Sequence, residues 1–129
     1  MKWPAQRREA PLEGVPAARR QKNYASQSGY AYEYFHEGRR ESGDGREYVF
    51  TASGDRKAWF TVSVVVPDAS TGEWERLHGR PLQDNERFAV AKLALMEAFD
   101  LRETPQAMRA PVLVTPEQVE ELLGRLGVE

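Results

Sequence analysis

The sequence predicts an α+β fold in which a four-stranded antiparallel meander is followed by two C-terminal helices packed on one sheet face. Three observations predict it. Apolar residues alternate with period two in the middle of the chain, the connections between these segments are short, and apolar residues then recur at helical spacing. With 129 residues and no cysteine, the chain has the length of one domain without a disulfide framework.

The first 28 residues differ from the rest in charge and in apolar content. They carry six basic and two acidic residues, a net charge of +4, whereas residues 29–129 carry twelve basic and eighteen acidic residues, a net charge of −6. Their few large apolar side chains cannot offset an ordering cost of roughly 1–2 kcal/mol per residue. We therefore expect a basic, mostly disordered arm over 1–28 and a single α+β domain over 29–129.

The first predicted strand covers residues 30–36, in which three tyrosines and His36 share one face. Residues 37–46 are polar, and Gly43 lies in a Gly-Asp-Gly sequence that offers the positive φ angles of a tight turn. Residues 47–53 alternate again. They predict the second strand.

Valine and aromatic residues fill the third predicted strand, residues 58–66, so we expect it to be central in the sheet. Pro67 ends it. Residues 73–78 alternate between two sets of side chains and predict a shorter fourth strand, whose polar face favours an edge position. Because the connections are short, neighbouring strands are expected to be antiparallel.

Two helices are expected after the sheet. Residues 86–101 place large apolar side chains and alanines on one face, after a cap at Asp84 or Asn85. The last helix begins after Thr115 in a Thr-Pro-Glu-Gln sequence, which is a capping box with proline at the first helical position. Between the helices, residues 112–114 either pair briefly as a fifth strand or pack without pairing.

The sequence offers few groups for catalysis. Without cysteine there is no thiolate nucleophile and no Cys-ligated metal site. The glycines around Gly43 precede a strand, so they do not predict a phosphate loop. His36 and His78 lie at the ends of different predicted strands. We predict no catalytic residue, no metal site and no cofactor, and we favour a protein that is not an enzyme.

Lys92 falls inside the apolar arc of its predicted helix. A buried lysine has a lowered pKa and can act as a base or form an imine. The more common arrangement lays the methylene groups over the edge of the core while the ammonium group reaches water. We expect the second arrangement.

The leading functional hypothesis is a small interaction or regulatory module that binds a protein partner, or a second copy of itself, through the sheet face opposite the helices. Tyrosine, tryptophan and arginine are enriched in such interfaces. The residues predicted on this face are Trp59, Thr61, Tyr32, Tyr34 and Trp74.

The first alternative is nucleic-acid binding through the basic arm and the arginine-rich turns, although the negative charge of residues 29–129 opposes it. The residues concerned are Arg7, Arg8, Arg19, Arg20, Lys22, Arg39, Arg40, Arg46, Arg56 and Lys57. The second alternative is a small-ligand binder or enzyme with a pocket between the sheet and the helices, containing His36, His78 or Lys92.

Composition also bears on origin and location. Arginine outnumbers lysine fourteen to four and isoleucine is absent, which indicates a GC-rich and therefore bacterial genome. No apolar run approaches the roughly 20 residues that cross a bilayer, and no secretory signal pattern is present. We expect a cytoplasmic protein that does not bind membranes.

Overall fold

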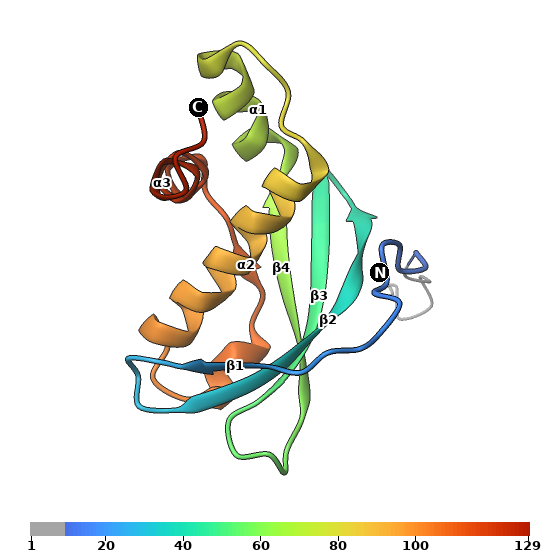
Figure 1. Cartoon of the computed structure of the whole chain (residues 1–129), viewed down its shortest axis with the longest axis vertical. Coiled ribbons are helices and arrows are strands. Elements are labelled where there is room, and N and C mark those ends of the chain that lie inside the picture. Colours follow the sequence, from blue (N-terminus) through green and yellow to red (C-terminus); the bar gives the residue numbers. More distant parts are fainter. Residues whose placement is uncertain (1–9) are drawn as a thin grey trace, which may run out of the picture.

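The computed structural model describes residues 10–129 and confirms the α+β fold (Figure 1). Five strands form one sheet in the order β1-β2-β3-β4-β5. The elements are β1 (Lys22–Ala25), β2 (Ala31–Ser42), β3 (Gly45–Ser53), β4 (Phe60–Pro67), α1 (Asp68–His78), α2 (Asp84–Leu101), the 3₁₀ helix η2 (Pro105–Arg109), β5 (Val112–Leu113) and α3 (Pro116–Arg125).

The four-stranded antiparallel meander is present, but its members are β1 to β4. β5 adds to β4 in parallel, with Val64 opposite Val112. The prediction that residues 58–66 form a central strand is confirmed, because β4 lies between β3 and β5. Of the two alternatives for residues 112–114, the brief fifth strand is the one observed.

The predicted fourth strand at residues 73–78 is wrong, because these residues belong to α1. Helical spacing buries Ser70, Thr71 and Trp74 together, whereas a strand would have placed Trp74 at an exposed edge. Gly79 ends the helix in the left-handed conformation, with φ of 72°. The resulting fold has three α-helices where the sequence predicted two.

The arm prediction is wrong at residues 22–25, which form β1. This strand pairs with the start of β2 and is held from the other side by α2. The Tyr24 hydroxyl donates to Asp100 at 2.7 Å, and its ring stacks on Phe99. Long-range contacts therefore order a segment that has little apolar content of its own. The part of the predicted arm over residues 1–9 lies outside the described residues.

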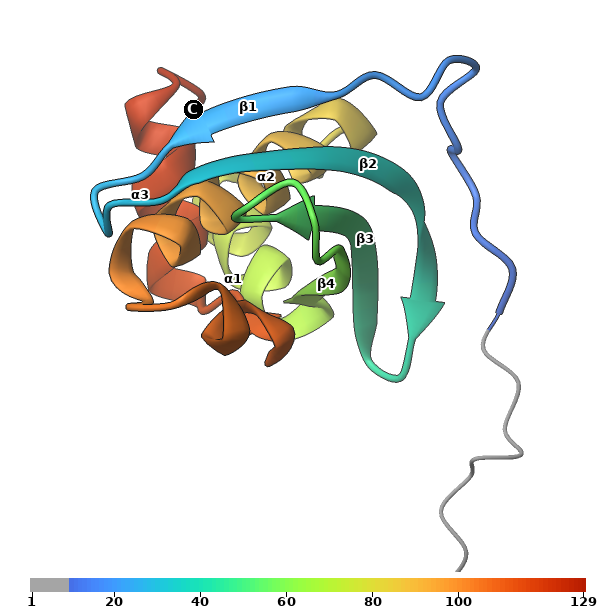
Figure 2. The same cartoon turned by 90° about the horizontal axis from the view of Figure 1, so that it is seen from below.

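The sheet curls strongly along β2 and β3 (Figure 2). A bulge shifts the register between His36 and Gly38, which is the kind of irregularity that bends a strand. The two strands meet in a two-residue turn, where Gly43 has φ of +60°, as the first position of a type II′ turn requires. The turn expected at Gly43 is confirmed, and β2 extends six residues beyond the predicted strand end at His36.

The three α-helices lie inside the curl (Figures 1 and 2). Phe99 of α2 is fully buried and stacks on Tyr32 with ring centroids 4.0 Å apart. The capping box of α3 is confirmed: Gln118 N donates to the Thr115 hydroxyl at 3.1 Å, and Thr115 N donates to the Gln118 side chain at 3.0 Å. Within residues 10–129, no helix combines the length and apolar character needed to span a bilayer.

Candidate functional site

Three of the five residues predicted on the uncovered sheet face lie elsewhere. Tyr32 and Tyr34 are buried on the helix side of the sheet, and Trp74 is buried in α1, so their predicted placement is wrong. Period-two alternation separates the two faces of a strand but does not say which face the helices cover. Thr61 is exposed beside the buried Phe60 and Val62, and Trp59 keeps 38% of its surface exposed.

Ion pairs occupy much of the uncovered face. Arg56 Nε lies 2.6 Å from the carboxylate of Glu33, whose side chain is almost fully buried. Arg40 and Glu47 are paired at 3.5 Å, and the Ser63 hydroxyl donates to the same glutamate at 2.5 Å. This face is therefore less apolar than the aromatic surface that the sequence predicted.

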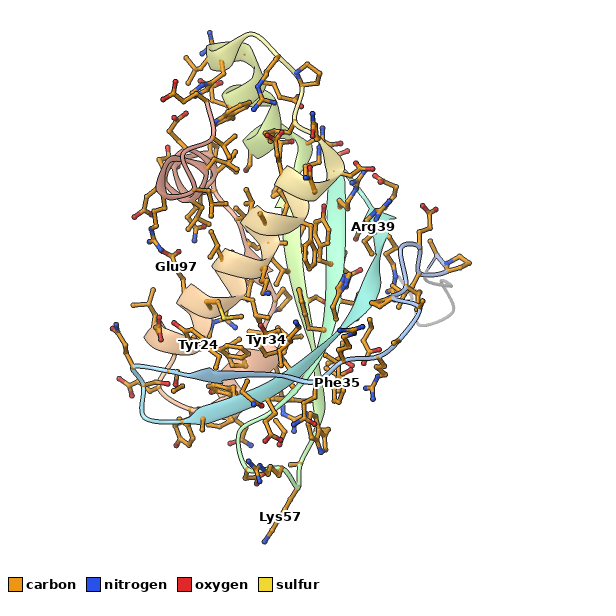
Figure 3. The ribbon with its side chains drawn as sticks, viewed as in Figure 1. Tyr24, Tyr34, Phe35, Arg39, Lys57 and Glu97 are labelled. Carbon is orange, nitrogen blue, oxygen red and sulfur yellow. The ribbon has the colours of Figure 1, made fainter. Side chains whose placement is uncertain are left out.

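Most of the arginines proposed for nucleic-acid binding are paired with carboxylates. Glu37, Asp84, Glu47, Glu41 and Glu33 supply the partners. The paired residues are Arg19, Arg39, Arg40, Arg46 and Arg56. Lys57 has no such partner among residues 10–129 and points away from the body at the tip of the β3–β4 loop (Figure 3). Arg7 and Arg8 lie outside the described residues, which leaves Arg20 and Lys22.

These last two residues line a cavity of about 440 Å³ between β2, β3, α2 and residues 14–21, which we call the strap. The strap and β1 form one wall, aromatic side chains of the sheet form the floor, and α2 forms the other wall. The lining residues are Pro16, Ala17, Ala18, Arg20, Lys22, Tyr34, His36, Phe50, Phe88 and Lys92. None of them is acidic, so the cavity, here called the basic cavity, carries only positive formal charge.

The three cations of the basic cavity come from three elements. Arg20 belongs to the strap, Lys22 to β1 and Lys92 to α2. Within residues 10–129, none of the three side chains forms a hydrogen bond or an ion pair. Lys92 is half-buried and belongs to the lining of the cavity. The arrangement gathers unneutralised charge at one place.

His36 packs between two phenylalanines of the cavity. Its ring centroid is 4.6 Å from that of Phe88 and 5.3 Å from that of Phe50. Burial lowers the pKa of His36, while a hydrogen bond to the backbone of Gly38 acts in the opposite direction. Nε2 is buried and has no hydrogen-bond partner in the described chain. His36 therefore brings a buried ring nitrogen without a described partner to the lining of the cavity.

The strap is fixed to β2 near both of its ends. Glu13 and Arg39 exchange two backbone hydrogen bonds of 2.7 and 2.8 Å just before it, and β1 follows it. Within the strap, Arg19 pairs with Glu37 at 2.7 Å, with its guanidinium 3.9 Å from the centroid of Phe35. The hydrogen bond from Arg19 lowers the pKa of Glu37. Neighbouring residues of the strap thus serve two purposes, since Arg19 anchors it and Arg20 lines the cavity.

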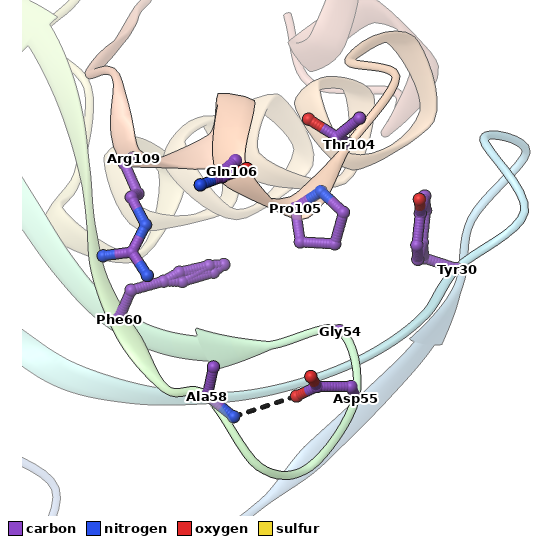
Figure 4. Close-up of a pocket in the computed structure, with 9 residues that line it drawn as sticks. All are labelled: Tyr30, Gly54, Asp55, Ala58, Phe60, Thr104, Pro105, Gln106 and Arg109. Atoms are coloured by element: carbon purple, nitrogen blue, oxygen red, sulfur yellow. Dashed lines mark hydrogen bonds between the residues drawn. The ribbon is translucent and has the colours of Figure 1, made fainter.

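A second cavity, of about 410 Å³, lies between η2 and the β3–β4 loop (Figure 4). Arg109 lies over the Phe60 ring, 5.0 Å from its centroid. The Asp55 carboxylate accepts hydrogen bonds from the backbone amides of Lys57 and Ala58 at 2.8 and 2.9 Å. This cavity holds one cation and one carboxylate, so it does not concentrate charge as the basic cavity does.

His36 and His78 are not brought together. His78 stacks on Trp74 with centroids 4.0 Å apart, and its Nε2 lies 3.0 Å from Glu120. Instead, the fold unites His36 with Lys92, two of the three residues named for a pocket between sheet and helices. No group of three potential metal ligands occurs among the described residues.

Sequence reasoning missed the strap as a cavity wall, and with it Pro16, Ala17 and Ala18. The helical pattern placed Phe88 in the core, although it is only partly buried and lines the cavity. The one local signal of this site in the sequence was Lys92, a charged residue within the apolar face of its predicted helix. Comparison with protein-family models, curated proteins and solved structures found no match to this chain.

Proposed function

We propose that this chain is a small-ligand-binding module whose basic cavity takes an anion attached to an apolar group. One observation carries the proposal: Arg20, Lys22 and Lys92 all lack a carboxylate partner within residues 10–129 and all line one cavity. Like charges held close together raise the local potential, and an anion relieves that repulsion.

The aromatic lining supports an apolar part of the ligand. Tyr34, Phe50 and Phe88 contribute rings, and none of the described residues that line the cavity carries a carboxylate. Binding pockets for small molecules combine a mostly apolar lining with a few polar groups in about 300–1,000 Å³. The basic cavity, at about 440 Å³, has this size and composition.

The proposal is tested by titrating the protein with phenyl phosphate, benzoate and neutral benzyl alcohol. The amide NMR signals of residues 16–22 and 88–92 report on the cavity walls. We expect at least one of the two anions to shift these signals in a saturable manner, while benzyl alcohol binds more weakly than that anion. The Lys92→Met variant should bind the anion about tenfold more weakly, since it keeps an apolar stem but loses a charged donor.

Lys57→Met is the matched control. It removes the same charge from an exposed loop tip that lines neither wall of the basic cavity. Unchanged binding in this variant supports a specific site. Equal weakening in both variants, or no response to either anion, contradicts the proposal.

A second candidate function is binding of a protein partner or a second copy of the chain to the uncovered sheet face. Trp59 favours it, because its ring packs on Phe35 with centroids 5.7 Å apart yet stays 38% exposed. Leu113 at the β5 edge is 64% exposed. For self-association, sedimentation velocity should show concentration-dependent mass that Trp59→Ser abolishes. A monomer at all micromolar concentrations argues against a second copy.

A further inference from the structure

We infer that the occupant of the basic cavity is a phosphate monoester carried on a single flat aromatic group. This inference rests on the proposed function and specifies the ligand class. It has two parts, the charged head and the aromatic body, and each part is carried by different residues.

The number and placement of the cations favour a phosphate head. A carboxylate is planar, with one charge and two oxygens, whereas a phosphate monoester has nearly two negative charges at pH 7 and three terminal oxygens. Arg20, Lys22 and Lys92 approach from the strap, from β1 and from α2. Three donors on three elements fit a tetrahedral group whose oxygens point in different directions. A single carboxylate carries one charge and would leave two of the three cations unneutralised, whereas a phosphate monoester would leave about one.

The ring cluster favours a flat aromatic body. Phe88 is only partly buried, and the His36 ring lies 4.6 Å from it. Phe50 and Tyr34 are almost completely buried behind this lining and support it, with their ring centroids 6.2 Å apart. The Tyr34 hydroxyl makes no hydrogen bond within the described chain, so it is free to donate to the ligand. Aromatic faces and edges of this kind accept stacked or tilted rings.

The strap favours a free small molecule over a polymer. Its two attachments, the backbone bonds between Glu13 and Arg39 and the pairing of β1 with β2, hold residues 14–21 along the cavity. A continuous nucleic-acid strand that contacted both Arg20 and Lys92 would have to pass this fixed segment. A monoester of one ring has no such constraint.

The experiment compares the dissociation constants of phenyl phosphate, benzoate and inorganic phosphate for the full-length protein by calorimetry and by the same NMR signals. We expect phenyl phosphate to bind at least about tenfold more tightly than either of the others, because only it supplies both parts. Arg20→Gln and Lys92→Met should each weaken the binding of phenyl phosphate about tenfold. Lys57→Met should leave it unchanged.

The outcomes separate this inference from the proposed function. If benzoate binds as tightly as phenyl phosphate and Lys92→Met still weakens its binding, the anion site is supported and the assignment to phosphate monoesters is overturned. If inorganic phosphate binds as tightly as phenyl phosphate, the inference that the ligand carries an aromatic group is overturned. If neither phenyl phosphate nor benzoate binds, the proposed function fails as well. A duplex or single-stranded oligonucleotide that outcompetes phenyl phosphate replaces the small molecule with a polymer.

Discussion

The paired arginines of the sheet and the unpaired cations of the basic cavity differ in a way that composition does not explain. Arg40, Arg46 and Arg56 each have a carboxylate within 4 Å, while Arg20 and Lys92 have none among residues 10–129. The whole chain has twenty acidic residues against eighteen basic ones, so carboxylates are not scarce. The lack of carboxylate partners is therefore local to the basic cavity. It marks the place where positive charge remains for a ligand to neutralise.

The two regions also differ in how the backbone is held. The paired arginines of the sheet lie on or beside β2 and β3, which are joined by a long ladder of hydrogen bonds. The strap has no ladder partner between Glu13 and Lys22. Arg20 can therefore be changed without altering the ladder that holds the paired arginines.

The largest expected effect comes from removing the Phe99 ring, which packs against tyrosines of both β1 and β2. Phe99→Ala should lower the free energy of unfolding by about 3–5 kcal/mol, because it deletes a fully buried ring between α2 and the tyrosines of the sheet. Chemical denaturation measures the loss. Leu101→Ala, in the same helix but 78% exposed, should change stability by no more than about 0.5 kcal/mol. Similar losses in the two variants would contradict the described core.

The next effect separates the strap from the sheet. Gly38 has φ of +143°, and a Cβ there would lie 2.9 Å from the Glu13 carbonyl oxygen. Gly38→Ala should cost about 1–3 kcal/mol and speed hydrogen exchange at the Glu13 and Arg39 amides. Gly72→Ala is the control, since its Cβ would meet nothing and alanine favours helix by about 1 kcal/mol. Unchanged exchange in Gly38→Ala would show that the strap is not held there.

A smaller effect distinguishes Arg19 from Arg20, two neighbouring residues of the strap with different proposed roles. Arg19→Gln removes the pair with Glu37 and should slightly lower stability, by less in high salt, because exposed ion pairs are screened. Arg20→Gln should leave the unfolding curve unchanged and weaken anion binding about tenfold. Thermal unfolding and NMR titration measure the two properties. If Arg19→Gln weakened anion binding and Arg20→Gln lowered stability instead, the roles proposed for these two residues would be wrong.

The smallest effect is a dependence of stability on pH. Burial lowers the pKa of His36 below its ordinary 6.5, so the unfolded chain takes up a proton before the folded one does. Stability from this group is complete above about pH 6.5 and declines as the pH falls toward the lower folded pKa. His36→Phe should flatten the slope between pH 7 and 5, whereas His78→Phe should keep the His36 contribution. Equal slopes in His36→Phe and the unaltered protein would refute this.

Local signals account for the parts of the fold that could be predicted. The capping residues Thr115, Pro116 and Gln118 lie beside one another, so the start of α3 could be predicted from the sequence. The α1 error arose because the side chains of residues 73–78 also alternate in the way that a strand requires. The correct signals were Asp68 in the first helical turn and Gly79 at the C-cap.

The basic cavity could not be predicted because no local pattern joins its parts. Lys22 and Lys92 are seventy positions apart, and their proximity depends on β1, which long-range contacts order. Composition favoured disorder there, since Tyr24 is the one large apolar residue of that strand. Lys92 alone stood out, and one cation in an apolar arc did not decide between a site and an exposed lysine.

The hydrogen bond between Tyr24 and Asp100 spans 76 positions in the chain, and it bears on the order of folding. The β2–β3 hairpin closes over two residues, so it forms early, whereas contacts of such long separation form late. During synthesis the first strand emerges well before α2 exists to hold it. We therefore expect the cavity to be completed among the last steps, and we expect the proposed ligand to bind only the finished fold and to stabilise it by mass action.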